Sequence, residues 1–300
     1  MRKEEVNIQM LTDTDEVHVG YSDENIVIID SMQKFIEVDA AHMSMSTIAI
    51  CLNGKVQAQM NGKDISLCRN QVAVIPPNTT VTDVMISPDF DMKAMFLNDG
   101  IIQGFLHEKM NVWNEMIYVH GLHVIDIDDE EMQFFNRFYE MLMMCFGKKS
   151  DSPYRQDVIQ SLLRGAVLAL CGVMRQIALP LDSARQASGQ ANSHFQRFLN
   201  LLHSEKRHRH RTVDSFAMEL CITPKYLSAL CKRQSGKTAS EWITEQQLED
   251  IRYYLRQTDM SIKQVSHLLD FPNTSFFGRY VKAHFGMTPG QIRQQSTALQ

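Results

Sequence analysis

The sequence predicts an α+β chain of more than one domain, with a β-rich N-terminal part and an all-helical C-terminal part. Short apolar stretches separated by turn residues run to about Leu97, whereas from about Asp129 the apolar residues recur with the period of a helix. Near the end of the chain one helical pattern occurs twice, about fifty residues apart. At 300 residues the chain is long for one domain and has ample length for two.

The first hundred residues are predicted to form an antiparallel barrel or sandwich. Apolar stretches at 26–29, 48–51 and 72–75 are separated by turn signals. Asn53-Gly54 and Asn61-Gly62 bracket an alternating stretch that is typical of one hairpin strand between tight turns. Many short strands with regular turns are typical of closed or two-layered antiparallel sheets.

The order of these signals resembles a cupin-type jelly roll: a strand, Asn61-Gly62, Leu67 and then Ile75-Pro76-Pro77. The resemblance covers about seventy residues. Metal-binding cupins carry a His-x-His pair with a later Glu and His, whereas here His42 has no partner at ligand spacing. A lone His is more often a structural residue than a ligand, so we predict no metal site and no cofactor.

Two helices are expected to follow the sheet region. Apolar residues from Met132 to Leu142 mark one face of the first. The second starts at Ser152-Pro153, with Ser as N-cap and Pro in the first turn, and runs towards Ile177. Its broad apolar surface has two interpretations that the sequence leaves open, which are packing against the sheet domain and dimerisation.

A change in composition marks the expected domain boundary. Pro180 to Ser193 lacks periodicity and is rich in Ser, Ala, Gln and Gly, which is typical of a flexible linker. The predicted organisation is therefore residues 1–178, a linker of residues 179–193, and residues 194–300.

Charge is distributed unevenly along the chain. Residues Ala191 to Gln300 include fifteen Lys and Arg and nine Asp and Glu, which gives this part a net charge of +6. The net charge of the whole chain is −5. A basic end attached to an acidic body is the layout of a module that approaches phosphates.

Cysteine usage and hydropathy predict a cytoplasmic protein without a membrane partner. The six cysteines form no C-x-x-C pair and have no His cluster at zinc-ligand spacing, so reduced core cysteines are expected. No apolar run reaches the roughly 18 to 20 residues that span a bilayer. The first residues lead into polar sequence without a hydrophobic signal core.

The repeated pattern predicts two helix-turn-helix units. In the first, a short helix from Val213 to Leu220 is followed by a turn at Cys221-Ile222 and a second helix that opens at Thr223-Pro224. Ala217 lies where the two helices would cross, and a bulky side chain there would push them apart. The second unit repeats the first helix with a shift of forty-nine residues and the second helix with a shift of fifty. Three identities support the repeat, with Lys232, Gly236 and Thr238 recurring as Lys282, Gly286 and Thr288.

A helix from Ser240 to Gln257 is expected to join the two units. Its eighteen residues span about 27 Å at about 1.5 Å per residue. That length can hold two recognition helices about one turn of B-DNA apart, which is roughly 34 Å.

This arrangement resembles the DNA-binding domain of the AraC/XylS family. Blocks at 223–236 and 271–289 carry the match, which covers Phe195 to about Gln294. Many members also have an N-terminal cupin-like effector and dimerisation domain. The resemblance implies that the second helix of each unit enters the major groove of double-stranded DNA. The side chains expected to contact DNA are Lys225, Ser228, Lys232 and Arg233 in the first unit and Thr274, Ser275, Arg279 and Lys282 in the second.

Four positions depart from the family pattern. Ala229 and Gln247 stand where members usually have Arg, Asp270 where they have Gly, and Ser266 where they have Ala. The first departure removes a base or phosphate contact, so we expect Arg279 of the second unit to discriminate sequence more strongly. The basic run 207–211 has two open interpretations, a solvated loop or a segment that positions phosphates.

Taken together, these features predict an α+β multidomain protein: a cupin-like β-barrel or jelly roll with accessory helices, followed by an all-α domain with two helix-turn-helix units. The expected function is sequence-specific transcription regulation by a homodimer under the control of a small-molecule effector. The resemblance implies an activator that touches RNA polymerase. The alternative is an effector-independent regulator whose N-terminal domain only dimerises or binds a protein partner. An enzyme is not expected, because the sequence has no metal set, Gly-rich phosphate loop or nucleophile motif.

Overall fold

The computed structural model describes residues 4–6, 17–23, 25–32, 40–106, 109–147, 154–187, 194–204, 211–257 and 259–297. The chain divides into two compact units. The N-terminal unit comprises Met1–Leu106 and Met116–Ala184, and the C-terminal unit comprises His107–Glu115 and Arg185–Gln300.

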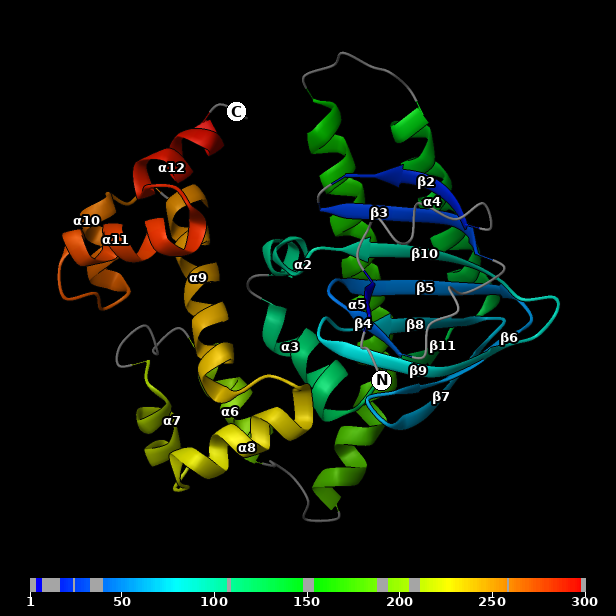
Figure 1. Cartoon of the computed structure of the whole chain (residues 1–300), viewed down its shortest axis with the longest axis horizontal. Helices are drawn as coiled ribbons and strands as arrows, with labels where there is room; N and C mark the ends of the chain where they lie inside the picture. Colours follow the sequence, from blue (N-terminus) through cyan, green and yellow to red (C-terminus); the bar gives the residue numbers. More distant parts are fainter. Residues whose placement is uncertain are drawn as a thin grey trace. The chain divides into compact units, whose positions relative to one another are not determined.

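The N-terminal unit contains two β-sheets (Figure 1). The first has the order β1 (Glu4–Val6), β4 (Ala40–Met43), β9 (Thr79–Ile86), β6 (Lys55–Met60) and β7 (Lys63–Cys68). The second has the order β11 (Val124–Asp126), β8 (Gln71–Ile75), β5 (Ser46–Asn53), β10 (Asp91–Leu97), β3 (Ile26–Met32) and β2 (Val17–Ser22). The described pairs are antiparallel except for β1 with β4.

The predicted hairpin strand is β6, and the structure confirms its bounds. Asn61 and Gly62 both have positive φ, 51° and 77°, which is the backbone that a two-residue turn between antiparallel strands requires. Gly54 at the other end has φ +68°, and an added Cβ would lie 2.7 Å from the backbone of Phe90. A side chain at Gly54 would therefore meet both conformational strain and a clash.

Both faces of the second sheet are covered. Ala49 and Cys51 of β5 point into a core that the two sheets share. Ile48 and Ile50 point to the opposite face, towards α4 (Asp129–Gly147) and α5 (Arg155–Ala187). Burial on both faces explains why these strands are continuous apolar stretches and do not alternate with polar residues.

The helix predicted from about Asp129 is α4. Its start is a capping box, because Asp128 Oδ1 accepts from the Glu131 backbone N–H at 2.8 Å and Glu131 Oε2 accepts from that of Asp128 at 3.0 Å. A shorter helix, α2 (Asp99–Leu106), and a π-helical turn over Glu115–Val119 precede it.

The linker prediction was wrong for its first nine residues. Helix α5 continues through Pro180 to Ala187, and residues 188–193 lie outside the described residues. The expected start at Ser152-Pro153 also lies outside them. Of the described helices, α5 is the one long and apolar enough over Arg155–Ala178 to cross a membrane by length and composition. A third of its most apolar 18-residue window is buried.

Burial keeps two of the six cysteines unreactive. It raises the pKa of the Cys231 thiol to about 12 and that of Cys51 to about 11, so both stay protonated at neutral pH. All six are free thiols in the structure.

The C-terminal unit is helical. In chain order its helices are α3 (Met110–Asn114), α6 (His194–Leu202), α7 (Val213–Glu219), α8 (Pro224–Ser235), α9 (Ala239–Gln257), α10 (Ile262–Leu268), α11 (Thr274–Phe285) and α12 (Pro289–Thr297) (Figure 1). Helix α9 is the predicted joining helix. Packed aromatic rings, among them the Phe198–Phe216 pair at 5.4 Å, lie beneath the first helix-turn-helix unit. A separate apolar cluster around Phe277 and Val281 lies beneath the second.

Candidate nucleic-acid interface

Helices α7 and α8 form the first helix-turn-helix unit. Thr212 and Ser215 make a capping box at the start of α7. Cys221 in the turn takes the left-handed conformation with φ 56°. Thr223 caps α8 by accepting the Tyr226 N–H at 3.2 Å, and α8 ends at Gly236, φ 76°.

Helices α10 and α11 repeat this construction. Ser261 and Gln264 form the capping box of α10, and Asp270 takes the left-handed turn conformation with φ 60°. Asn273 caps α11 by accepting the Phe276 N–H at 2.8 Å, and α11 ends at Gly286, φ 69°. The repeat predicted from the sequence is thus a repeat of backbone geometry as well.

The helix crossing in each unit is tight. Ala217 is fully buried and Ser266 is 2% exposed at the equivalent position. Their carbonyl oxygens accept the N–H groups of Ile222 and Phe271, each at 3.0 Å, and so close the two turns alike. Ser266 replaces the family's usual Ala without changing this arrangement, because a hydroxyl adds little volume.

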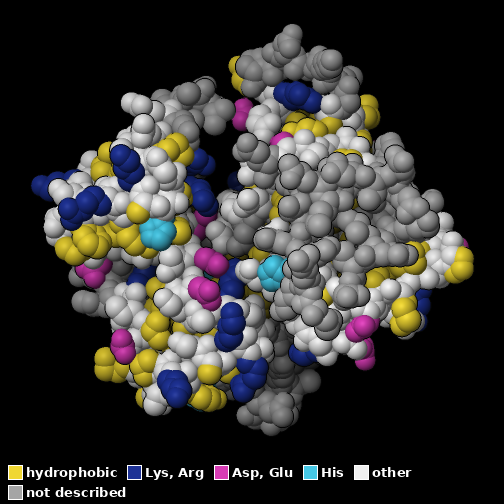
Figure 2. Space-filling view, in the orientation of Figure 1, with side chains coloured by type: hydrophobic (Ala, Val, Ile, Leu, Met, Phe, Trp, Pro, Cys, Tyr) yellow, Lys and Arg dark blue, Asp and Glu magenta, His cyan; other side chains and the backbone are white. Residues whose placement is uncertain are grey.

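The eight residues predicted to contact DNA lie on the outer surfaces of α8 and α11. Seven of these side chains are exposed and Ser228 is half-buried. Within the described residues, none of the eight side chains takes part in a hydrogen bond or ion pair. Figure 2 shows Lys and Arg side chains spread over the surface of the C-terminal unit. The two recognition helices therefore present free donors and positive charge to a ligand.

The two recognition surfaces differ in chemistry at equivalent positions. Ala229 of α8 is exposed and offers a methyl group, whereas Arg279 of α11 is exposed and offers a guanidinium group. Gln247, which replaces a usual Arg on the joining helix, has an internal role here. Its Oε1 accepts the Tyr280 hydroxyl at 3.2 Å and so connects α9 to α11.

Of the basic run 207–211, the structure describes the last residue, Arg211. Arg211 pairs with Asp250 of α9 at 2.5 Å, and both side chains are only 5% exposed. For Arg211 the structure therefore contradicts both sequence interpretations, because its guanidinium group lies inside the domain beside the Asp250 carboxylate. Residues 207–210 lie outside the described residues.

Two exposed aromatic residues were missed by the sequence analysis. Tyr226 is 46% exposed and Phe276 44%, at the equivalent third position of α8 and α11. The apolar pattern assigned neither residue to the DNA-contacting surface. Each directly precedes a fully buried residue, Leu227 or Phe277, and adjacent residues lie about 100° apart around a helix. That spacing places them at the edge of the recognition surface.

Two capped helix pairs with free basic surfaces define a DNA-binding module of the helix-turn-helix class, and comparison with known proteins agrees. Residues 216–295 match a family described as "Helix-turn-helix domain". An uncharacterised regulator of this type from Bacillus subtilis, YtdP, is 33% identical over 88 residues, 29% of this chain and 11% of that protein. YpdC of Escherichia coli is 26% identical over 152 residues, 51% of each chain.

One solved structure, from Chromobacterium violaceum, carries the description AraC-type DNA-binding domain-containing protein. It is 27% identical, and the match covers 35% of this chain and 96% of that one with a TM-score of 0.30. The present chain spans about half or less of the length of the two curated relatives above. Residues 216–295 of the C-terminal unit thus match a helix-turn-helix family, and the two curated relatives are named as transcriptional regulators.

The turn residue Cys221 makes a testable energetic contribution. A left-handed conformation costs most L-residues about 1–2 kcal/mol. Replacing Cys221 with Gly is therefore expected to raise the free energy of unfolding by about 1 kcal/mol after the greater chain entropy of Gly is subtracted. Asp270→Gly should gain less, because Asp tolerates this conformation better. Urea unfolding followed by circular dichroism would measure both.

The control for this experiment is Met218→Gly, an exposed position inside α7 where Gly should cost up to about 1 kcal/mol. Equal destabilisation by Cys221→Gly and Met218→Gly would show that the turn conformation carries no relievable strain.

Proposed function

We propose that this chain is a sequence-specific DNA-binding transcription regulator whose α8 and α11 enter successive segments of the major groove. One observation carries the proposal: two units built alike present exposed polar and basic side chains that have no partner among the described residues. Phosphates are suited to flexible ammonium groups, which Lys225, Lys232 and Lys282 provide, and to the forked guanidinium group of Arg233. Acceptor atoms on the base edges can receive hydrogen bonds from the hydroxyl groups of Ser228, Thr274 and Ser275 and from the guanidinium group of Arg279.

Salt dependence of DNA binding tests this proposal. Affinity for a duplex of about 30 base pairs should fall steeply with salt, because each neutralised phosphate releases a condensed counterion and adds about −0.9 to the slope of log K against log salt. Fluorescence anisotropy at several salt concentrations measures it. Replacing Lys232 with Ala should reduce the slope by about one, whereas Lys63→Ala on β7 of the N-terminal unit should leave it unchanged. A folded chain without salt-dependent binding would defeat the proposal.

For the N-terminal unit we propose a cupin-like barrel that binds an effector and controls the DNA-binding domain. Two sheets around a shared apolar core support it. We propose residues 1–178 as this domain, extended by the rest of α5 to Ala187, and residues 194–300 as the DNA-binding domain. The regulator is proposed to be a cytoplasmic activator that contacts RNA polymerase.

The competing proposal is that the N-terminal domain only dimerises or binds a protein partner. DNA affinity that depends on a small molecule separates it from effector control. No group of three or more His, Cys, Asp or Glu able to hold a metal occurs among the described residues. We propose an organic effector.

We further propose that α5 joins two copies of the chain. Val158 on its exposed side is 47% exposed, Tyr154 just before the helix is 69% exposed, and Leu162 follows Val158 one turn later. Val158→Glu is expected to convert the dimer to a monomer at micromolar concentration, because two carboxylates would be buried against each other. Gln156→Glu, at an exposed polar position of the same helix, should leave it dimeric. Sedimentation velocity distinguishes these outcomes, and a monomeric wild-type chain would overturn the proposal.

A further inference from the structure

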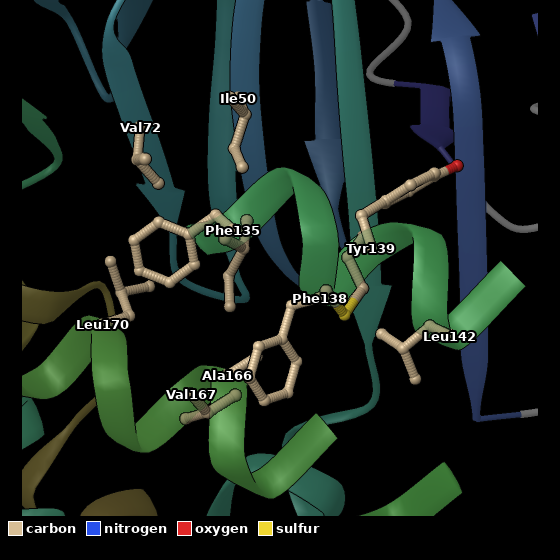
Figure 3. A pocket seen from close by; sticks show the side chains of 11 residues that line it. Ile50, Val72, Phe135, Phe138, Tyr139, Leu142, Ala166, Val167 and Leu170 are labelled. Carbon is tan, nitrogen blue, oxygen red and sulfur yellow. The ribbon is translucent and has the colours of Figure 1, made fainter. Parts of the chain in front are cut away.

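A cavity lies inside the N-terminal unit between the outer face of the second sheet and helices α4 and α5 (Figure 3). Its volume is about 40 Å³, and it is partly open to solvent. This is a different place from the space between the two sheets, which core side chains such as Cys51, Met92 and Phe96 fill. The lining residues are Ile48, Ile50, Val72 and Met95 of the sheet, Phe135, Phe138, Tyr139 and Leu142 of α4, and Ala166, Val167 and Leu170 of α5.

The lining is apolar throughout. Strands β5, β8 and β10 contribute aliphatic chains, and the helices contribute aliphatic chains and rings. Tyr139 lines the cavity with its ring, while its hydroxyl points away from the other labelled side chains (Figure 3). Lys93 Nζ lies 4.3 Å from the centre of that ring and fixes it by a cation–π contact. A charged or strongly polar molecule would lose its hydration here without gaining a hydrogen bond.

Phenylalanine rings form the wall on the α4 side. Phe134 and Phe138 pack at 5.1 Å between ring centres, and Phe134 and Phe135 pack edge to face at 5.5 Å. Phe138 is half-buried and lies directly over Gly165 of α5, where an added Cβ would stand 3.1 Å from its Cζ. The glycine thus leaves the space that this ring occupies.

We propose that this cavity is a binding site for a small uncharged apolar molecule, namely a single ring or a short alkyl chain. One water needs roughly 10–15 Å³ of such space, so the cavity holds about three heavy atoms and the rest of the molecule extends towards solvent. The aromatic wall favours a ring, because edge-to-face contacts add to burial. Helix α5 forms the opposite wall, so a bound molecule changes the helix that we propose for dimerisation. That regulatory consequence rests on the proposed function, whereas the binding site does not.

Fluorobenzene is the probe, titrated into the full-length chain and followed by its ¹⁹F NMR signal. Ala166→Leu places three extra carbon atoms in the cavity and is expected to weaken binding at least tenfold. Leu142→Ala enlarges the cavity and is expected to strengthen binding severalfold. Ala169→Leu adds the same volume to a half-buried position of α5 outside the lining, and it should bind as the wild type does.

Circular dichroism establishes that each variant folds. Should Ala166→Leu fail to fold, the tighter binding of Leu142→Ala decides the matter alone. Absence of fluorobenzene binding to the wild type, or equal weakening by Ala166→Leu and Ala169→Leu, would overturn the site. DNA binding measured on the same samples separates the two ideas, because its absence defeats the proposed function and leaves the cavity result standing.

Discussion

Replacing Arg279 with Ala is expected to reduce discrimination between the preferred DNA site and a single-base mismatch by about 1–3 kcal/mol, roughly 5- to 150-fold. Arg279 is exposed on the outer face of α11 and has no hydrogen-bonding partner among the described residues. Its planar guanidinium can donate two hydrogen bonds to the O6 and N7 atoms of a guanine, whereas Ala donates none. Competition binding with matched and mismatched duplexes measures this loss.

Lys225→Ala is the comparison, because Lys225 lies at the same kind of exposed surface on α8. An ammonium group suits a phosphate as a point charge, so this variant should weaken binding by a similar factor on every sequence. The opposite result, uniform weakening by Arg279→Ala and relaxed specificity by Lys225→Ala, would make the assignment wrong. At the position equivalent to Arg279 the first unit has Ala229, which can contact only an apolar group such as a thymine methyl.

Asp250→Ala is expected to lower the free energy of unfolding of the C-terminal unit by about 3–5 kcal/mol, because it leaves the buried Arg211 guanidinium without this carboxylate. The pair joins Arg211, two residues before α7, to the middle of α9, so its loss should also loosen the first unit. Urea unfolding followed by circular dichroism measures the change. Asp259→Ala, at an exposed acidic position just beyond α9, is the control and should change stability by less than about 0.5 kcal/mol.

The double variant Arg211→Met with Asp250→Leu tests the cause of that loss. Replacing both charges with apolar side chains removes the need for pairing, so most of the stability should return. If the double variant were as unstable as Asp250→Ala, packing around Asp250 and not its charge would explain the loss.

The helix-turn-helix units could be predicted closely because their signals are local. Thr223-Pro224 places a capping side chain and a residue with fixed φ at the start of α8, and Gly236 ends it. The joining helix was predicted from Ser240 and begins at Ala239, with the same last residue. In the N-terminal unit, the strands could also be predicted from local signals, because turn residues separate the short apolar stretches that form them.

Features that depend on distant contacts could not be predicted. Arg211 and Asp250 are separated by 39 positions, and no local pattern pairs them. The continuation of α5 beyond Pro180 contradicts the local preference, since a proline inside a helix removes one hydrogen bond. The order of the strands in the two sheets, with β5 between β8 and β10, likewise follows from contacts far apart in the chain. The DNA contacts and the division of the chain into an effector and a DNA-binding domain remain predictions.

Helix α9 also sets a rotational relation between the two recognition helices. It runs without interruption for 19 residues. Buried residues near its start pack in the first unit, and Ile251 and Leu255 near its end belong to the core of the second. Each residue of a helix advances it by about 1.5 Å and turns it by about 100°. A single residue inserted in α9 would therefore change the separation of α8 and α11 only slightly, but would turn one of them away from the groove that the other faces. In the evolution of such a chain, the length of α9 is constrained more tightly by the relative rotation of α8 and α11 than by the distance between them.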